Sequence, residues 1–431
     1  MNAILFTNNN LRLRDNLTLQ KAEQESEELV ALFFINQAGS KKKVWEMQKI
    51  WPYRAKFLIE SVQNLEKNIE RLWWKLHKIV WDDITKIFDF CKEHNIEKVF
   101  VQQQFGSEEQ TEMQKLSRAL DSKDRKLIEV YDGTMVHLDD LPFNIQDLPD
   151  VYTHFRRAVE KAKPNMHERY EWPWENTFSS VEDFTSDKLS LEFFWFNEEE
   201  ARTDSRAAIK FIGWEDEAWS RLHHYFWKTE KLAKYKETRN GLVWADYSSK
   251  FSAWLAHGCI SARSIYSEVK RFESEVKKND STYWLIFELL WRDYFQFLFI
   301  QDNTQFFHDF PEENAKLSKE KQQKFERWQN GELWVPFVDA NMLELKLTGF
   351  MSNRGRQNVA SYLVKDLQVD RQRWAMHFEN LLIDYDLASN WWNWAYQAWV
   401  GNDPRDNRYF NIEKQQWMYD RKWEYRKLWS N

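Results

Sequence analysis

Residues 350–366 read FMSNRGRQNVASYLVKD, and residues 381–390 read LLIDYDLASN. In the first segment Arg354 and Arg356 flank a glycine, where the backbone can approach a ligand closely. Guanidinium groups pair well with phosphate oxygens, so the pattern suggests a diphosphate, although an Arg-x-Arg pair can also be a surface ion-pair element. Asp384 and Asp386 could accept hydrogen bonds from a ribose or an amine, or could cap a helix. The chain therefore contains residues that could bind the diphosphate and the ribose of a nucleotide-like ligand.

These segments resemble the flavin-binding domain of the photolyase and cryptochrome superfamily, and within it the DASH-type cryptochromes. Three further blocks agree: YKETRNG at 235–241, DYSSKFS at 246–252 and NDSTYWLIFELLWRDYF at 279–295. The resemblance is strong from about residue 230 to 412 and weaker but continuous before it. It implies FAD as the cofactor, and light-driven electron transfer from the reduced flavin to a cyclobutane pyrimidine dimer in DNA.

The order of the predicted elements divides the chain into two domains and a connector. Buried strands are predicted at 2–7, 29–35 and 97–102, with helices at 53–76 and 83–94. This alternation predicts an α/β N-terminal domain with a doubly wound parallel sheet over residues 1–130. Residues 131–200, richer in Pro, Asp and Asn, are expected to form an interdomain connector. Residues 201–431 are expected to be all-α and, by the resemblance, to bind FAD.

Composition limits the class of protein and its surroundings. The chain has 431 residues, 43% of them hydrophobic, and a net charge of −7, so any DNA contact needs a local basic patch. Candidates for such a patch are Lys250, Arg292, Lys346, Arg354 and Arg356. Cys91 and Cys259 offer neither a disulfide framework nor metal-ligand spacing, so no metal site is predicted. Without a signal peptide or a long apolar run, a soluble cytoplasmic protein with no membrane contact is expected.

Glycine is scarce in this chain and tryptophan is abundant. There are 10 Gly and 25 Trp, whereas average usage would give roughly 30 glycines. Several tryptophans stand where the resembling family has glycine, namely Trp51, Trp244, Trp334, Trp392 and Trp399. A glycine site can require positive φ or close packing, and an indole there is unfavourable. The sequence is therefore that of an altered or unusual member.

The resemblance assigns the flavin contacts by position. They fall on Tyr235, Ser248, Ser249, Lys250, Phe251, Ser252, Arg292, Asn353, Arg356, Asp384, Asp386 and Asn390. The SSKFS run can supply hydroxyls, backbone amides and a cation to the diphosphate. Arg356 is expected near flavin N5, paired with Asp384, and Asn390 is expected to donate to N5. An asparagine at that position favours the fully reduced anionic flavin of repair enzymes.

One helical face is expected to contact the substrate, because Glu288, Trp291 and Arg292 fall on it. By the resemblance, Glu288 hydrogen-bonds the flipped dimer and Trp291 stacks beside it. The residues alone would equally allow a buried ion pair between Glu288 and Arg292. Gln357 and Tyr396 are DASH-like substrate-binding residues that indicate a more polar pocket. Single-stranded DNA is then the preferred partner, because flipping a base out of it is easier.

In this family three tryptophans relay electrons from the surface to the flavin. Trp394 matches the proximal one and completes the predicted catalytic set with Glu288, Trp291 and Asn390. Arg371 and Ser318 stand at the middle and distal positions. Candidates for a detour, which otherwise are core or surface aromatics, are Trp374, Trp391 and Trp392. Weak or rerouted photoreduction is therefore predicted.

The α/β domain of this family also binds an antenna pigment, commonly a reduced folate such as methenyltetrahydrofolate. Residues 105–110, FGSEEQ, resemble the segment that supplies a carboxylate to it. Glu108 or Glu109 is then the antenna candidate, unless both only interact with a helix dipole.

Three functions remain open at this stage. The leading hypothesis is a monomeric enzyme of the deoxyribodipyrimidine photolyase type, which repairs dimers preferentially in single-stranded DNA. The second is a blue-light photoreceptor that signals through a change in flavin redox state. The third is a folded member whose flavin binding is impaired by the tryptophans at glycine positions. Retention of Glu288, Trp291 and Asn390 favours repair.

Overall fold

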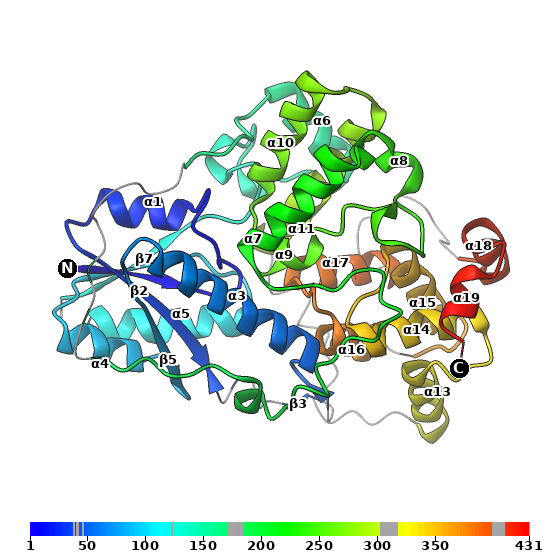
Figure 1. Cartoon of the computed structure of the whole chain (residues 1–431), viewed down its shortest axis with the longest axis horizontal. Coiled ribbons are helices and arrows are strands. Elements are labelled where there is room, and N and C mark those ends of the chain that lie inside the picture. Colours follow the sequence, from blue (N-terminus) through cyan, green and yellow to red (C-terminus); the bar gives the residue numbers. More distant parts are fainter. Residues whose placement is uncertain are drawn as a thin grey trace.

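The structure is a computed structural model that describes residues 1–37, 39, 43–44, 47–121, 124–170, 179, 181, 184–301, 318–369, 371–398 and 410–430. For residues 43–44, 371–372, 374 and 394–398 the description covers the backbone alone. Figure 1 shows two halves, a sheet flanked by helices and a helical half that follows it in the chain.

A five-stranded sheet in the order β5-β2-β1-β6-β7 forms the N-terminal half. Its strands are β1 (Asn2–Phe6), β2 (Leu29–Asn36), β5 (Leu76–Trp81), β6 (Lys98–Gln102) and β7 (Lys126–Val130), and all neighbouring pairs are parallel. β2 is apolar and buried along nearly its whole length, as an inner strand of a covered parallel sheet should be. The predicted doubly wound α/β class is confirmed. A short antiparallel pair, β3 (Lys43–Val44) and β4 (Met47–Gln48), lies outside this sheet.

Helices cover both faces of the sheet. They are α1 (Leu17–Gln24) and α3 (Pro52–Glu70) on one face, and α4 (Lys86–Glu93) and α5 (Ser107–Asp121) on the other. Side chains alternate along a strand, so Ile4 and Phe6 of β1 join the core under α1 and α3. Ala3 and Leu5 point the other way, into the core under α4 and α5.

The second half is helical, and the described residues from 201 onward contain no strand. Its helices are α7 (Glu215–His223), α8 (Tyr235–Thr238), α9 (Ser252–Ala256), α10 (Ala262–Glu275), α11 (Asp280–Gln301), α13 (Lys319–Asn330), α14 (Pro336–Thr348), α15 (Asn353–Lys365), α16 (Arg371–Leu381), α17 (Leu387–Ala398), α18 (Ile412–Tyr419) and α19 (Glu424–Leu428), with a π-helical turn at His224–Lys228. The predicted all-α second half is confirmed. Within the described ranges no helix is both long enough and apolar enough to cross a membrane.

Several elements were not anticipated from the sequence, including the two edge strands of the sheet, β5 and β7, and one helix. The helix expected over 53–76 ends at Glu70, and Leu76–Trp81 forms the edge strand β5 instead. The connector expected at 131–200 contains an 11-residue helix, α6 (Tyr152–Ala162). Its buried residues Tyr152, Phe155 and Val159 recur at helical spacing and face α11.

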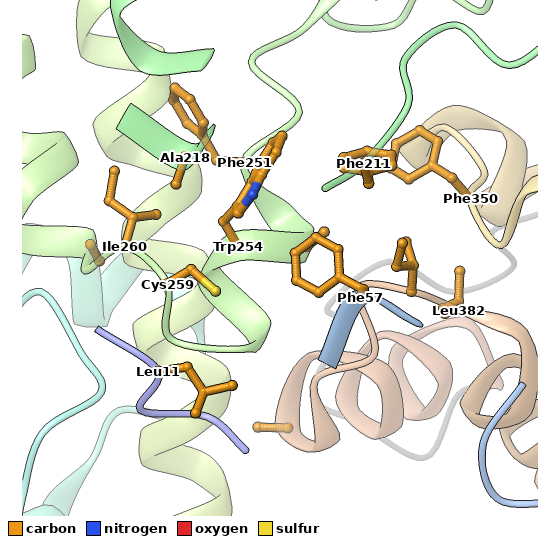
Figure 2. Packing of buried hydrophobic residues seen from close by; sticks show 14 of the residues in the cluster. Leu11, Phe57, Phe211, Ala218, Phe251, Trp254, Cys259, Ile260, Phe350 and Leu382 are labelled. Carbon is orange, nitrogen blue, oxygen red and sulfur yellow. The ribbon is translucent and has the colours of Figure 1, made fainter. Parts of the chain in front are cut away.

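One aromatic core joins the two halves, as Figure 2 shows. The ring of Phe57 on α3 lies 6.3 Å from that of Trp254 on α9, measured between centroids. Phe211 lies 5.3 Å from Trp254 and 5.1 Å from Phe350. Nε1 of Trp254 donates to the carbonyl of Ile212 at 2.8 Å, so this buried indole keeps its hydrogen bond. The halves cannot separate without exposing these rings.

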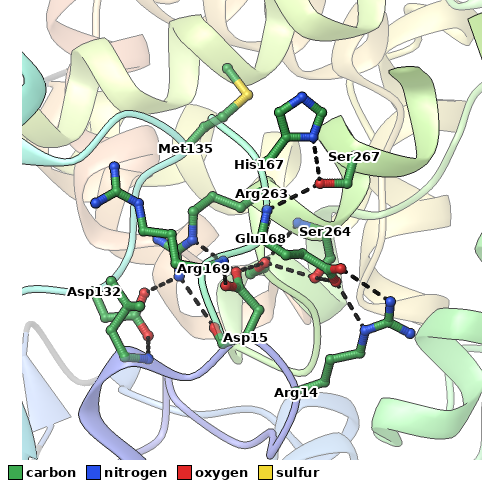
Figure 3. Close-up of polar contacts among 12 residues, drawn as sticks. Arg14, Asp15, Asp132, Met135, His167, Glu168, Arg169, Arg263, Ser264 and Ser267 are labelled. Carbon is green, nitrogen blue, oxygen red and sulfur yellow. Dashed lines mark hydrogen bonds and ion pairs between the residues drawn. The ribbon is translucent and has the colours of Figure 1, made fainter. Parts of the chain in front are cut away.

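A buried ion network joins the same two halves (Figure 3). Asp132, which follows β7, receives Arg12 Nη2 on Oδ2 at 2.6 Å and Arg263 Nη2 on Oδ1 at 2.6 Å. Arg263 on α10 also reaches Asp15 Oδ2 through Nε at 2.8 Å. These four side chains are at most 4% exposed. Burial opposes the ionisation of Asp132, but the two guanidinium groups outweigh it and lower the pKa of this carboxyl.

Two other buried carboxyls hold loops through the backbone. Glu215 accepts the N–H groups of Leu13–Arg14 at 3.0 and 3.1 Å. Asp293 accepts those of Met135–Val136 at 3.0 and 2.9 Å. Burial raises the pKa of each to about 7, against the opposing effect of these hydrogen bonds.

We therefore expect the apoprotein to lose stability as the pH rises toward 7. The loss begins near the ordinary pKa values of the two carboxyls, which are 4.5 for Glu215 and 3.8 for Asp293. In that interval the folded state retains protons that the unfolded state has released. The stability present below the pKa values of the unfolded chain is therefore lost as the pH rises through the pKa values of the folded chain. Urea unfolding at a series of pH values measures the slope. Glu215→Gln and Asp293→Asn should each flatten it, and an unchanged slope in both variants would contradict the assignment.

Candidate functional site

Six of the predicted flavin and substrate residues line one cavity of about 80 Å³. They are Asn353, Arg356, Gln357, Asp384, Asp386 and Asn390. The cavity lies between the first turn of α15 and the turn that leads into α17. α15 begins where the Ser352 hydroxyl accepts the N–H of Gly355 at 3.0 Å. A Cβ on Gly355 would lie 2.0 Å from Asn341 Oδ1, so the glycine between the two arginines allows α15 to approach α14.

The two arginines of this segment have different surroundings. Arg356 Nη2 contacts both carboxylate oxygens of Asp384, at 2.9 and 2.7 Å, and its Nε donates to the Met351 carbonyl at 2.9 Å. Arg354 does not line the cavity, and its Nη2 donates to Asn240 at 3.0 Å. The structure thus places Arg356, and not Arg354, in the candidate site, with Asp384 as its partner.

The remaining polar groups of the cavity are held by the backbone of α16 and α17. Asp386 Oδ1 accepts the N–H of Ser389 at 2.7 Å, so this carboxylate caps α17 as well as lining the cavity. Asn390 Nδ2 donates to the carbonyl of Ala375 at 3.1 Å, and the side chain is buried. Helix capping was one of the two interpretations of Asp386 from the sequence and is confirmed, while a hydrogen bond to a ligand stays a prediction.

Glu288 on α11 has partners that the sequence did not suggest. Arg239 Nη1 lies 2.6 Å from Glu288 Oε1, and Trp284 Nε1 donates to the same oxygen at 3.1 Å. Burial raises the pKa of Glu288, and the Arg239 charge opposes that shift. Arg292 points elsewhere and donates to the Gly133 carbonyl at 2.5 Å, so the alternative Glu288–Arg292 ion pair is wrong. Arg239 lies inside the YKETRNG block, which was the available signal.

Trp291 follows Glu288 by three residues and so lies one turn further along α11. Its ring stacks on Tyr152 of α6, with a centroid separation of 3.6 Å and an interplanar angle of 14°. Tyr152 also donates its hydroxyl to the Phe287 carbonyl at 2.7 Å. The connector therefore fixes the indole beside Glu288, a contact between segments far apart in sequence that no local pattern reveals.

The predicted cofactor loop lies just before and at the start of α9. Ser249, Lys250 and Phe251 are buried, while Ser248 and Ser252 are more accessible. Tyr235, the first residue of α8, is buried as well.

Several predicted positions concern side chains outside the described residues. They are Trp394, Tyr396, Arg371, Trp374 and Trp399. Ser318, at the predicted distal relay position, begins α13, and its hydroxyl accepts the N–H of Lys321 at 3.3 Å. Trp391 is 6% exposed and belongs to the core, with Trp392 packed against that core.

A larger cavity of about 370 Å³ lies at the carboxyl ends of β1 and β2, between the two halves. Both antenna candidates line it, but they differ in surroundings. Glu108 forms an ion pair with Lys49 and its side chain is 53% exposed, whereas burial raises the pKa of Glu109. The cavity is also lined by Glu379 of α16, whose pKa burial raises too. Both glutamates are solvent-accessible, so the two candidates differ only in the Lys49 ion pair of Glu108 and the raised pKa of Glu109. Asp386 lines both this cavity and the smaller one.

The chain is similar to known proteins over nearly its whole length. A family described as the FAD binding domain of DNA photolyase matches residues 284–430, and one described as DNA photolyase matches residues 3–172. Cryptochrome DASH of Synechocystis is 41% identical over 99% of this chain and 86% of its own length. The chain belongs to the photolyase and cryptochrome family, in its DASH branch. Cryptochrome DASH of Xenopus laevis is 40% identical over 99% of this chain and 82% of its own length.

Solved structures of the family agree with this DASH-type fold. The crystal structure of the Synechocystis cryptochrome superposes with a TM-score of 0.92 at 40% identity, covering 100% of this chain and 88% of that one. An archaeal photolyase from Sulfolobus tokodaii, described as holding two FAD molecules, superposes with a TM-score of 0.79 at 22% identity, covering 100% and 90%. The latter likeness concerns the fold alone.

The cofactor of this DASH-type cryptochrome is FAD, and the residues present fit it. Lys250 is buried, and its Nζ has no hydrogen-bond partner among the described residues. Nζ lies 3.6 Å from the ring centroid of Tyr247 and 4.5 Å from that of Phe350. Burial lowers the pKa of Lys250 to about 7, against the opposing charge of Glu344. A buried amine without a hydrogen-bonded counter-ion is a suitable partner for an anionic group such as a diphosphate.

Proposed function

We propose that this protein repairs cyclobutane pyrimidine dimers, preferentially in single-stranded DNA, by light-driven electron transfer from reduced FAD. The observation that carries the proposal is the pair of Glu288 and Trp291, held one turn apart on α11. Arg239 and Trp284 fix Glu288 through Oε1, and among the described residues no donor occupies Oε2. That oxygen can accept the N–H of a pyrimidine, while Trp291, held flat against Tyr152, supplies an aromatic wall.

The cofactor supplies light absorption and the transferred electron, and the chain supplies its position. We assign Arg356, paired with Asp384, and Asn390 to the isoalloxazine end, where Asn390 can donate without ever becoming charged. The loop from Ser248 to Ser252 is assigned to the diphosphate, as the orphaned amine of Lys250 supports. Trp394 keeps its predicted role as the proximal electron donor.

One feature of the cavity supports a single-stranded substrate. Gln357 lines the cavity beside Asn390, which makes this wall polar. A polar wall binds the apolar face of a dimer less favourably than an aromatic side chain would. The free-energy cost of unstacking the dimer from a duplex is then less well compensated, which favours single-stranded DNA. Tyr396 is assigned to the same pocket.

We further propose that the cavity of about 370 Å³ holds an antenna pigment of the reduced-folate class. Glu109 is the assigned carboxyl, because it lines the cavity at the strand ends, where it can accept from a heterocycle with adjacent N–H donors, whereas Glu108 is paired with Lys49. The shared lining residue Asp386 places this cavity next to the flavin residues, as energy transfer requires.

Glu288→Gln tests the repair assignment. We expect the rate of dimer loss under blue light to fall about ten- to a hundredfold, because a charged hydrogen bond to the substrate becomes a neutral one. The assay follows a single dimer in a short oligothymidylate, with the flavin absorption spectrum recorded in parallel. Glu320→Gln, at a 75% exposed carboxylate on α13, is the matched control and should repair normally.

Wild-type repair with no effect of Glu288→Gln would contradict the assigned role. A wild type whose flavin responds to light but which repairs nothing would refute the repair function and favour blue-light signalling instead.

Binding of FAD should be accompanied by proton uptake. Between pH 7 and the ordinary lysine value of 10.5, the amine of Lys250 is largely neutral without a counter-ion and becomes charged beside a diphosphate. Calorimetric titration of the apoprotein with FAD, in two buffers of different ionisation enthalpy, measures the uptake. Lys250→Met should abolish it, and equal heats in both buffers for the wild type would exclude Lys250 as a diphosphate partner.

A further inference from the structure

Arg221 is a buried residue of α7, and all three nitrogens of its guanidinium group bond to the loop that precedes α9. Its Nε donates to the Ser249 carbonyl at 2.9 Å, and its Nη2 donates to the carbonyls of Ser248 at 2.9 Å and Ala245 at 3.2 Å. Its Nη1 pairs with Asp246 Oδ1 at 2.7 Å. One cation therefore holds the loop through the carbonyls of Ala245, Ser248 and Ser249 and through the carboxylate of Asp246.

Holding these carbonyls also sets the direction of the amides. In a trans peptide the C=O of one residue and the N–H of the next point in opposite directions. The peptides whose carbonyls face Arg221 therefore direct the N–H groups of Ser249 and Lys250 away from it. In the described part of the chain neither N–H has a hydrogen-bond partner.

The backbone beyond them has the alternation that gathers amides around an anion. Lys250 has a left-handed φ of 63°, and Phe251 follows with φ −75° and ψ −10° in the right-handed region. Alternating hands turn successive N–H groups toward one point, which binds anionic oxygens. A left-handed lysine is unfavourable by itself, so contacts elsewhere must hold the loop in this form.

We propose that Arg221 is a positioning residue that holds the Ser248–Ser252 backbone in its anion-binding conformation, so that its amides receive the diphosphate of FAD. This inference rests on the proposed assignment of that loop. Asp246 extends the same support, because its Oδ2 lies 3.0 Å from His224 Nε2 on the π-helical turn that follows α7. Arg221 touches no part of the cofactor and acts only through the loop.

The test compares Arg221→Gln and Arg221→Lys with Arg271→Gln, a 52% exposed arginine on α10, as the matched control. Apoprotein is titrated with FAD and, separately, with riboflavin, which has the same ring system without the diphosphate. We expect Arg221→Gln to weaken FAD binding at least about tenfold and to leave riboflavin binding unchanged. Arg221→Lys should be intermediate, because one ammonium cannot satisfy the same fork of acceptors.

Thermal unfolding of each apoprotein separates a local effect from misfolding. Unchanged FAD affinity in Arg221→Gln would overturn the proposal. So would an equal loss of FAD and riboflavin, which would indicate a general structural role. None of these readouts uses dimer repair, so failure of the repair function would leave this test intact.

An independent observation concerns tryptophan in left-handed backbone. Twelve described residues other than glycine have positive φ, and five of them are tryptophans: Trp73, Trp195, Trp244, Trp334 and Trp423. These side chains are 47% to 93% exposed, so burial of the indole compensates little for the conformation. Trp244, with φ 81° and ψ 151°, occupies a region that only glycine readily adopts. The other seven are Asp, Asn, Lys, Glu or Gln, of which Asp and Asn tolerate this region better.

We infer that these five positions are glycine in the protein as its own cell makes it. One codon that is translated as tryptophan in the given sequence would then be translated as glycine in the host cell. The low glycine count, 10 against 25 tryptophans, is what such decoding would produce in the written sequence.

Peptide mapping by mass spectrometry of the protein isolated from its own host tests this directly. We expect the mass of glycine at all five positions and the mass of tryptophan at the buried Trp254, Trp328 and Trp429. The gene should show one codon at the five positions and a different one at the three buried positions. Tryptophan masses at the five positions, or the same codon in both groups, would overturn the inference.

Discussion

Replacing Asp132 by asparagine is expected to lower the free energy of unfolding by about 3 to 5 kcal/mol. Asp132 is buried between Arg12 and Arg263 and accepts both guanidinium groups at 2.6 Å. The substitution leaves two buried cations with a neutral amide, whose NH₂ group can donate but cannot accept. Because Arg12 belongs to the sheet half and Arg263 to the helical half, the loss weakens the contact between the two.

Urea unfolding measures this loss, with Asp139→Asn as the control. Asp139 lies seven residues away, and its side chain is 89% exposed. We expect the control to change stability by less than about 0.5 kcal/mol. If Asp132→Asn were equally mild, the network would not tie the halves together.

Replacing the five left-handed tryptophans by glycine is expected to stabilise a protein that carries tryptophan at these positions. A left-handed conformation disfavours an L-residue by about 1 to 2 kcal/mol, and the greater freedom of glycine in the unfolded state offsets about 0.5 to 1 kcal/mol of that. Each change should then contribute about 0.5 to 1 kcal/mol, and all five together about 3 to 5 kcal/mol. The five positions lie apart in the sequence, which favours additivity.

Trp417→Gly is the matched control for the glycine series. Trp417 is 61% exposed but lies inside α18, where its backbone is right-handed. There the same substitution should destabilise by about 1 kcal/mol, because glycine is a poor helix former. Thermal and urea unfolding would show opposite signs for Trp417→Gly and Trp334→Gly. Equal signs would mean that loss of the indole, and not backbone conformation, decides the effect.

The candidate flavin cavity was predictable because its residues lie in two short segments. Asn353 and Arg356 share the first turn of α15, and Asp384, Asp386 and Asn390 are within seven residues of each other. Local spacing fixes which residues share a turn, so a contiguous motif carries most of such a site.

The missed parts are contacts between distant segments. Glu288 pairs with Arg239 and not with Arg292, although Arg292 has the shorter sequence separation. The helix expected to continue to residue 76 ends before it, and the edge strand β5 forms because β2 offers hydrogen-bonding partners for Leu76–Trp81. The strand propensity of a segment does not reveal which other strand it will pair with.

Hydrophobic periodicity is a local property, so the fold class and the order of a parallel α/β half and a helical half could be predicted from the sequence. The tertiary structure, in contrast, decided that Glu108 pairs with Lys49 while desolvation raises the pKa of the Glu109 carboxyl. It also decided that Arg221 organises the loop before α9. Burial and hydrogen-bond partners depend on which segments meet in space, and a carboxylate or guanidinium acquires its role only when its partners are in place.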